Sequence, residues 1–169
     1  MPETPTDHLD SIVEQWRRER PDLDTDALGT LGRLFRAAQL ADAALAEPMR
    51  RYGLEQGWFD LLAALRRTGS PFELNPTALR RATMLSSGGM TKRLDRLEEA
   101  GLIERHPDPA DRRGTLVRLT RKGRTLIDKA VETHGANEKR ILEALGTGEQ
   151  RQLDRLLRAL LAELEPPEA

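Results

Sequence analysis

The sequence predicts a mainly helical protein with one small β-hairpin, and three observations lead to this class. Apolar residues recur at helical spacing over most of the 169 residues, prolines and glycines separate these stretches, and only two short runs alternate as β-strands do. Hydrophobic residues make up 38% of the chain and aromatic residues 4%. One core of ordinary size is therefore expected, filled mainly by leucine and alanine.

The first two expected helices lie in the N-terminal third. Residues 7–19 carry an apolar stripe that includes Trp16, and this helix is too short to be stable without packing on another part of the protein or on a second chain. A long helix should run from about residue 24 to residue 52, with a kink at Pro48 and its end at Gly53.

Three shorter helices are expected next. The first spans about 57–68 and should turn Trp58 and its leucines inward. The second begins at the cap residue Asn75, and the third follows a brief turn and ends at Gly101. Two tightly joined helices, the second with serine, threonine, lysine and arginine on its outer side, are typical of a helix-turn-helix.

A β-hairpin and two further helices complete the chain. Residues 103–107 and 115–119 should be strands on either side of a turn-rich loop, 108–114, which makes a basic wing. Thr120 should cap a helix that reaches about Leu145. Thr147 and Gln150 should form the capping box of a last, leucine-rich helix.

Charge is segregated along the chain although the formal net charge is only −1. Between Arg66 and Arg124 there are 14 lysines and arginines against 7 aspartates and glutamates, whereas the remainder holds 13 against 21. A basic module on an otherwise acidic protein is suited to hold a polyanion at one face. A solvated charged surface would explain the same composition, so the residues of the basic segment must decide.

Several classes of function are disfavoured by what the sequence lacks. It has no cysteine, its three histidines show no i, i+4 pair, and it contains no phosphate-binding loop of Walker or Rossmann spacing. We therefore predict no metal site, no cofactor and no enzymatic activity. No apolar run approaches the roughly 20 residues of a membrane span, and the N-terminus is acidic and polar, so a cytoplasmic protein is expected.

The basic segment carries side chains suited to double-stranded DNA. Short or basic residues on the outer side of a helix allow close approach to base edges in the major groove, whereas guanidinium groups on a narrow hairpin suit the minor groove. Close helix packing would explain the glycines equally well, and a solvated turn would explain the wing arginines. The predicted DNA contacts are Ser86, Ser87, Gly88, Thr91, Lys92, Arg93 and Arg96 on the helix, with Arg112 and Arg113 on the wing.

The terminal helices predict a homodimer. They offer more apolar surface than one small winged module can cover, and two paired copies would present two recognition helices to half-sites about one DNA turn apart. By expected role we divide the chain into 1–56 for dimerisation and a ligand cleft, 57–119 as a winged helix-turn-helix DNA-binding domain, and 120–169 for dimerisation.

Three segments in this order and spacing resemble the MarR family of winged-helix regulators: 97–105, 108–114 and 117–123. The resemblance covers about residues 27 to 164 and implies a homodimer that usually represses transcription from a palindromic operator. It also implies release by a small, often anionic or aromatic molecule that enters a cleft between the dimerisation and DNA-binding regions. In such proteins Asp111 would orient the wing arginines.

Four residues resemble the ligand cleft of the urate-responsive subgroup: Trp16, Asp60, Arg93 and Arg105. The resemblance implies that Trp16 stacks on a planar ligand and that Arg93 pairs with its negative charge. Asp60 and Arg105 would form a charge pair that the ligand disturbs. Related members respond to citrate- or aconitate-like carboxylates, so urate-like and citrate-like effectors both stay open.

Each of these residues has a simpler explanation. Trp16 would serve equally as the packing anchor of its helix, Asp60 as a surface carboxylate, Arg93 as a phosphate contact, and Arg105 as a partner of Glu104 or Asp108. Two other functions also compete with a ligand-responsive repressor. An architectural protein would bind DNA without sequence preference. A carboxylate enzyme using Asp60 and Arg93 ranks far lower because no nucleophile accompanies them.

Overall fold

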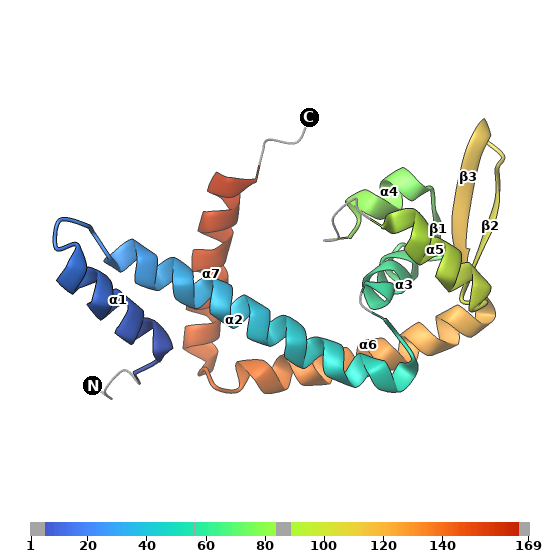
Figure 1. Ribbon diagram of the computed structural model, residues 1–169. Coiled ribbons are helices and arrows are strands. Elements are labelled where there is room, and N and C mark those ends of the chain that lie inside the picture. Colours follow the sequence, from blue (N-terminus) through green and yellow to red (C-terminus); the bar gives the residue numbers. More distant parts are fainter. Residues whose placement is uncertain (1–5, 56, 84–88, 166–169) are drawn as a thin grey trace. The chain divides into compact units, whose positions relative to one another are not determined.

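The computed structural model describes residues 6–55, 57–83 and 89–165 (Figure 1). In this part of the chain the helices are α1 (His8–Glu19), α2 (Asp26–Met49), α3 (Trp58–Arg67), α4 (Pro76–Arg81), α5 (Met90–Glu99), α6 (Arg121–Leu142) and α7 (Thr147–Leu164), with a 3-10 helix at Arg50–Tyr52. The strands are β1 (Glu73–Leu74), β2 (Ile103–Asp108) and β3 (Asp111–Leu119). The predicted class, mainly helical with a small hairpin, is confirmed.

The chain forms two compact units that divide within α2. One unit extends to Ala46 and the other begins at Glu47. The division by role at 56/57 and 119/120 concerns function and stays a prediction. Among the described residues, no helix has the length and apolar character needed to cross a lipid bilayer.

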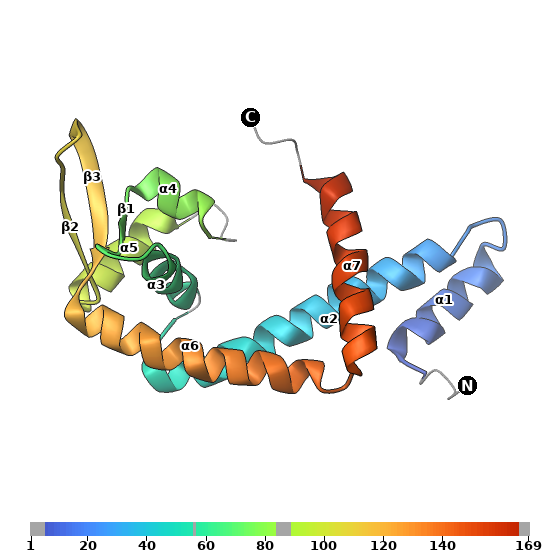
Figure 2. The ribbon, with the colours of Figure 1, turned by 180° about the vertical axis from the view of Figure 1, so that it is seen from behind.

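The N-terminal unit is a pair of helices that two glycines hold at close range. Figures 1 and 2 show α1 beside the first half of α2. A Cβ atom at Gly32 would lie 2.8 Å from Leu9 Cδ1, and one at Gly29 would lie 3.2 Å from Val13 Cγ2. Glycine at these two positions therefore lets the side chains of α1 approach the backbone of α2.

An ion-pair cluster fixes the start of α1 on the same surface. Asp7 caps α1, and its carboxylate also accepts a hydrogen bond from Arg33 Nε at 2.7 Å. This hydrogen bond is the largest cause that lowers the pKa of Asp7. Further along α1, Val13 is buried whereas Trp16 is 44% exposed, so Val13 is the packing anchor of the helix.

The core of the second unit joins α3, α4, α5, the sheet and α6. All of these elements contribute side chains with almost no exposed surface: Leu61, Leu62, Leu65, Leu79, Leu97, Ile103, Val117 and Ile127. The inward positions predicted for Trp58 and its leucines are confirmed. Because one apolar cluster connects these elements, α5 and the hairpin are held on a common scaffold.

The sheet has three antiparallel strands in the order β1-β3-β2, one more than predicted. Strand β1 pairs Glu73 with Arg118 of β3. Its two residues are too few to show any alternation, and for this reason the sequence pattern missed it.

The hairpin is also longer than predicted. Strand β3 begins at Asp111, so the expected loop 108–114 shrinks to a turn at Pro109 and Ala110. Asp108 Oδ1 accepts a hydrogen bond from the Ala110 N–H at 2.8 Å and thereby closes this turn. The register between β2 and β3 shifts after Pro107, which accommodates the tight connection.

Three helix boundaries differ from the prediction. Helix α7 is capped at Gly146, whose N–H donates to Glu149 Oε2 at 2.7 Å, so the predicted box of Thr147 and Gln150 is wrong by one residue. Glycine has no side chain to accept a bond in return, so half of a capping box is present. Helix α6 ends at Leu142, and α2 continues through Pro48 for one more residue.

The joint between α5, β2 and α6 is closely packed. Thr120 caps α6 as predicted, and its Oγ1 both accepts from the Gly123 N–H at 3.0 Å and donates to the Gly101 carbonyl at 2.8 Å. A Cβ atom at Gly123 would lie 2.9 Å from the carbonyl carbon of Leu102 and closer still to its oxygen. The first turn of α6 therefore rests directly on the backbone that connects α5 with β2.

Substitution of Gly123 by alanine should destabilise the protein, although alanine ordinarily favours a helix by about 1 kcal/mol over glycine. The added methyl group overlaps the Leu102 backbone, and such overpacking costs about 1–3 kcal/mol. Gly135→Ala is the matched control, because a Cβ atom there meets nothing within 4 Å and should stabilise α6. Urea unfolding at equal protein concentration measures both variants, and equal effects would contradict the close contact at Gly123.

Candidate nucleic-acid interface

Helix α5 turns one side to the core and leaves the opposite side exposed. Gly89 caps it in the left-handed conformation, at φ 81°, and Met90, Leu94 and Leu97 are buried. These three positions fix the rotation of the helix, so Lys92 lies on its exposed side. Lys92 is therefore accessible on the outer side of α5, and its contact with DNA stays a prediction.

The other predicted contacts of α5 divide into three groups. Thr91 and Arg96 are exposed, as a contact with DNA requires. Arg93 is half-buried, and its guanidinium lies beside Gly89, 3.4 Å from where a Cβ atom would stand. The predicted contacts Ser86, Ser87 and Gly88 lie outside the described residues.

The predicted wing arginines lie at the start of β3. Arg112 and Arg113 are exposed and follow the turn between β2 and β3, which in Figure 1 extends beyond α5. Asp111 Oδ1 accepts a hydrogen bond from the Arg113 N–H at 3.0 Å, so this carboxylate constrains the backbone that carries the arginines. The role expected for Asp111, to orient the wing arginines, stays a prediction and agrees with this contact.

Arg105 connects the hairpin to α5. Its Nη1 lies 2.7 Å from Asp95 Oδ1 and 3.4 Å from Glu98 Oε2, and its backbone N–H donates to Glu98 Oε1 at 3.0 Å. Arg105 thus pairs with Asp95 and Glu98 rather than with Asp60, and within the described residues it forms no ion pair with the alternative partners Glu104 and Asp108. Strand β2 runs beside α5, so the α5 carboxylates of Asp95 and Glu98 come within reach of Arg105.

Arg96 forms an ion pair with Glu55, which precedes α3. Arg96 Nη1 lies 2.8 Å from Glu55 Oε2, and both side chains are about half exposed, at 47% and 57%. A carboxylate therefore binds a guanidinium that the sequence predicts to contact DNA. The two residues are 41 positions apart, so no local pattern reveals this pair.

Glu73 gathers charged groups on the sheet and was not singled out from the sequence. Arg118 Nε donates to Glu73 Oε2 at 2.7 Å, and His106 Nε2 lies 3.1 Å from the same oxygen. The hydrogen bond from Arg118, with a smaller contribution from His106, lowers the pKa of Glu73. The carboxylate thus stays ionised at neutral pH and links all three strands.

The residues predicted to form a ligand cleft are distributed over both units. Trp16 belongs to the unit that ends at Ala46, whereas Asp60, Arg93 and Arg105 belong to the other. Asp60 is half-buried in the first turn of α3. In the described part of the chain no three histidine, aspartate or glutamate side chains gather as metal ligands would.

Comparison with known proteins shows a relationship along most of the chain. A model of the MarR family matches residues 52–114, a span that includes α5 and the wing arginines. The chain is 41% identical over 157 residues to the HTH-type transcriptional regulator PecS of Dickeya dadantii (strain 3937). This match covers 93% of the present chain and 92% of PecS.

Two solved structures resemble the fold at 28% identity. A mutant of MarR from E. coli, complexed with operator DNA, gives a TM-score of 0.71 over 81% of this chain and 97% of that one. A structure of BpsR from Bordetella bronchiseptica, which concerns regulation of its DNA binding by 6-hydroxynicotinic acid, gives a TM-score of 0.70. That match covers 82% of this chain and 95% of BpsR.

Substitution of Glu55 by glutamine should strengthen binding to duplex DNA. The change releases Arg96 from its carboxylate partner, so the guanidinium no longer has to leave an ion pair to contact a phosphate. We expect a gain of a few fold, because exposed ion pairs contribute about 1 kcal/mol or less. Fluorescence anisotropy with a labelled duplex at fixed salt measures the change.

Glu143→Gln serves as the control because it removes the same charge from an exposed position outside α5 and its neighbours. Equal gains in the two variants would mean that net charge alone acts, and the Glu55 contact would then have no specific effect.

Proposed function

Because the chain belongs to the MarR family of DNA-binding transcriptional regulators, we propose that it is a homodimeric repressor that binds a palindromic operator. A small anionic or aromatic effector releases it. The observation that carries the proposal is the exposure of α7, since 18 residues of helix bury no side chain in their own chain. An architectural protein that binds DNA without sequence preference is the alternative.

The apolar side of α7 is suited to a second copy of the chain. Its leucines repeat at helical spacing and are 37% to 72% exposed: Leu153, Leu156, Leu160, Leu161 and Leu164. The other unit also exposes large apolar side chains on α2, among them Phe35 at 65%. Exposed apolar side chains in such number are typical of an interface, and a two-fold pairing would bury those of α7 on both copies at once.

Dimerisation would give the α5 contacts their specificity. One recognition helix and one wing make few base contacts, whereas two copies in a fixed arrangement read two half-sites together. The carboxylates around α5 repel phosphates that approach out of register. They therefore favour a duplex of matching shape more than a polyanion of any other shape.

The double variant Leu156→Glu and Leu160→Glu should be monomeric and should lose operator binding by 100-fold or more. Burying a charge without a partner costs free energy, and each of the two chains would bring two new carboxylates into the interface. Ala162→Glu is the control, because Ala162 is exposed on the opposite side of α7. Sedimentation velocity and anisotropy with the upstream promoter duplex measure both properties. A monomer that keeps its operator affinity would refute the dimeric repressor.

A competition assay separates the repressor from the architectural protein. Binding to the promoter duplex is measured against random duplex at constant salt. Phosphate contacts alone give a ratio near one, whereas base contacts at two half-sites give a ratio of about 10³ or more.

Effector response is proposed to act through Arg93. This residue lies on α5, so an anion that attracts its guanidinium would displace the helix that reads the major groove. Asp60 and Arg105 would support the ligand from neighbouring elements, and the contribution of Trp16 stays a prediction. The regulation of BpsR by 6-hydroxynicotinic acid, an aromatic acid, supports this class of effector.

Arg93→Ala should weaken operator binding about tenfold or more and also remove the thermal stabilisation by urate or citrate, whichever ligand stabilises the unmodified protein. Arg96→Ala is the matched control, since it should weaken operator binding but leave the thermal shift intact. Differential scanning fluorimetry, with the melting temperature of each free variant as reference, provides the measurement. A full ligand shift in Arg93→Ala would exclude this residue from the effector site.

A further inference from the structure

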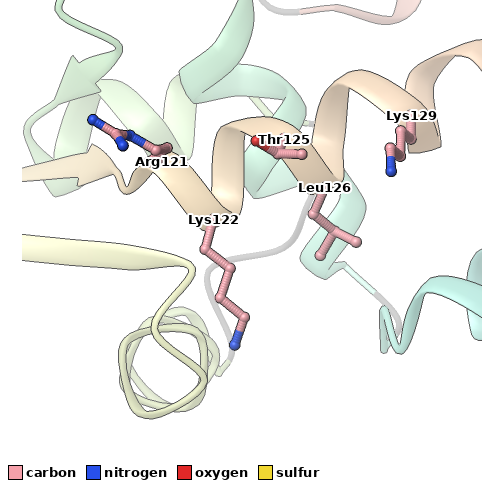
Figure 3. A pocket seen from close by; sticks show the side chains of 5 residues that line it. All are labelled: Arg121, Lys122, Thr125, Leu126 and Lys129. Carbon is pink, nitrogen blue, oxygen red and sulfur yellow. The ribbon is translucent and has the colours of Figure 1, made fainter.

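A hollow of about 610 Å³ lies along one side of α6, close to its N-terminal end. Its lining residues are Arg121, Lys122, Thr125, Leu126 and Lys129 (Figure 3). We call it the α6 groove. Its volume lies in the range of sites that take small organic ligands, about 300–1,000 Å³. None of its lining residues belongs to the predicted DNA contacts or to the predicted ligand cleft.

Three of these residues form one stripe of the helix. Lys122, Leu126 and Lys129 follow one another at spacings of four and three residues, which places them on a single face. Figure 3 shows their side chains extending to the same side of α6. The groove therefore presents a leucine between two ammonium groups.

The positive charge of the α6 groove is not neutralised by the surrounding protein. Within the described part of the chain, Arg121, Lys122 and Lys129 form no ion pair with a carboxylate. Asp128, the acidic neighbour of Lys129 on α6, is bound instead by Arg66 Nε at 2.6 Å. Glu132 is the next acidic side chain along the helix and is exposed.

Arg124, by contrast, is a basic residue of α6 whose charge is engaged by neighbouring side chains. Its guanidinium lies 4.6 Å from the centre of the Phe72 ring, and its Nε lies 3.9 Å from Asp128 Oδ2. Arg124 is thus engaged with an aromatic ring and a carboxylate, whereas the groove offers cations to a ligand.

Lys122 also touches the end of α5. Its Nζ donates to the carbonyl oxygen of Ala100 at 2.7 Å, and Ala100 is the C-terminal cap residue of α5. An anion binds an ammonium group more strongly than a neutral carbonyl does. An anionic ligand in the groove would therefore attract the same ammonium group that contacts Ala100.

We propose that the α6 groove is a second effector site, which takes a small organic anion with an apolar body. Lys122 and Lys129 bind the acidic group, and Leu126 contacts the apolar body. When the ligand draws Lys122 from Ala100, the C-terminal end of α5 loses a contact that holds it against α6. This last step rests on the proposed function, because it matters only where α5 reads DNA.

The test uses 2-naphthoate as the anionic probe and 2-naphthamide as its neutral counterpart, on the full chain without DNA. Isothermal titration calorimetry should show saturable binding of 2-naphthoate and at least tenfold weaker binding of 2-naphthamide. The double variant Lys122→Gln and Lys129→Gln should bind 2-naphthoate at least tenfold more weakly. Lys139→Gln is the control, an exposed lysine of α6 outside the groove, and it should bind as the unmodified protein does.

Three outcomes would overturn the site: no saturable binding of 2-naphthoate, equal binding of acid and amide, or unchanged affinity in the double variant. A double variant that loses promoter binding but keeps 2-naphthoate binding would assign the lysines to DNA phosphates instead. Promoter affinity with and without 2-naphthoate is measured separately. Absence of promoter binding by the unmodified protein would thus count against the proposed function. It would not affect the evidence for anion binding in the α6 groove.

Discussion

The contact of α6 with the backbone between α5 and β2 is the constraint on which the rest of the second unit depends. Gly123 allows the first turn of α6 to rest on Leu102, and Thr120 bonds the carbonyl of Gly101 beside it. Through this single joint, the end of α5, the base of the hairpin and the start of α6 are held together. Movement of any of the three elements must be transmitted to the other two.

Polar contacts on the outer side of α5 differ in kind from the packing beneath it. Buried leucines set the depth and rotation of the helix, while Arg105 and Glu55 bind its exposed side through ion pairs. The Arg96–Glu55 pair is about half exposed, and exposed ion pairs are weak and screened by salt, so this pair biases the helix without fixing it. If α5 binds DNA as proposed, a phosphate could replace such a partner at little cost in free energy.

The sequence predicted the elements whose signal is local. Helical spacing identified the buried side of α5, so Lys92 and Arg96 were expected outside, and Asn75 marked the start of α4. Strand β1 escaped because two residues carry no period, and the cap of α7 was misplaced by one residue because Thr147 and Gly146 both suit such a position. Short-range signals fix an element better than they fix its exact end.

Contacts between distant residues lay beyond the sequence. The partner of Arg96 is 41 residues away, and several carboxylates lie close enough to Arg105 in the sequence to be its partner. Geometry decided among them, because β2 runs back along α5 and brings Asp95 within reach. The α6 groove was equally hidden, since only the tertiary structure shows that Asp128 is committed to Arg66 and leaves the neighbouring lysines without a carboxylate.

The exposure of the leucines along α7 bears on how the stability of the chain depends on its concentration. An isolated helix of 18 residues is only marginally stable in water, so in the proposed homodimer α7 would gain much of its order from association with the second copy. In that dimer, the fraction of ordered C-terminal segments would rise with subunit concentration by mass action. Newly made chains at low abundance would expose their leucines to proteases and chaperones, and the amount of active protein would respond more than proportionally to its rate of synthesis.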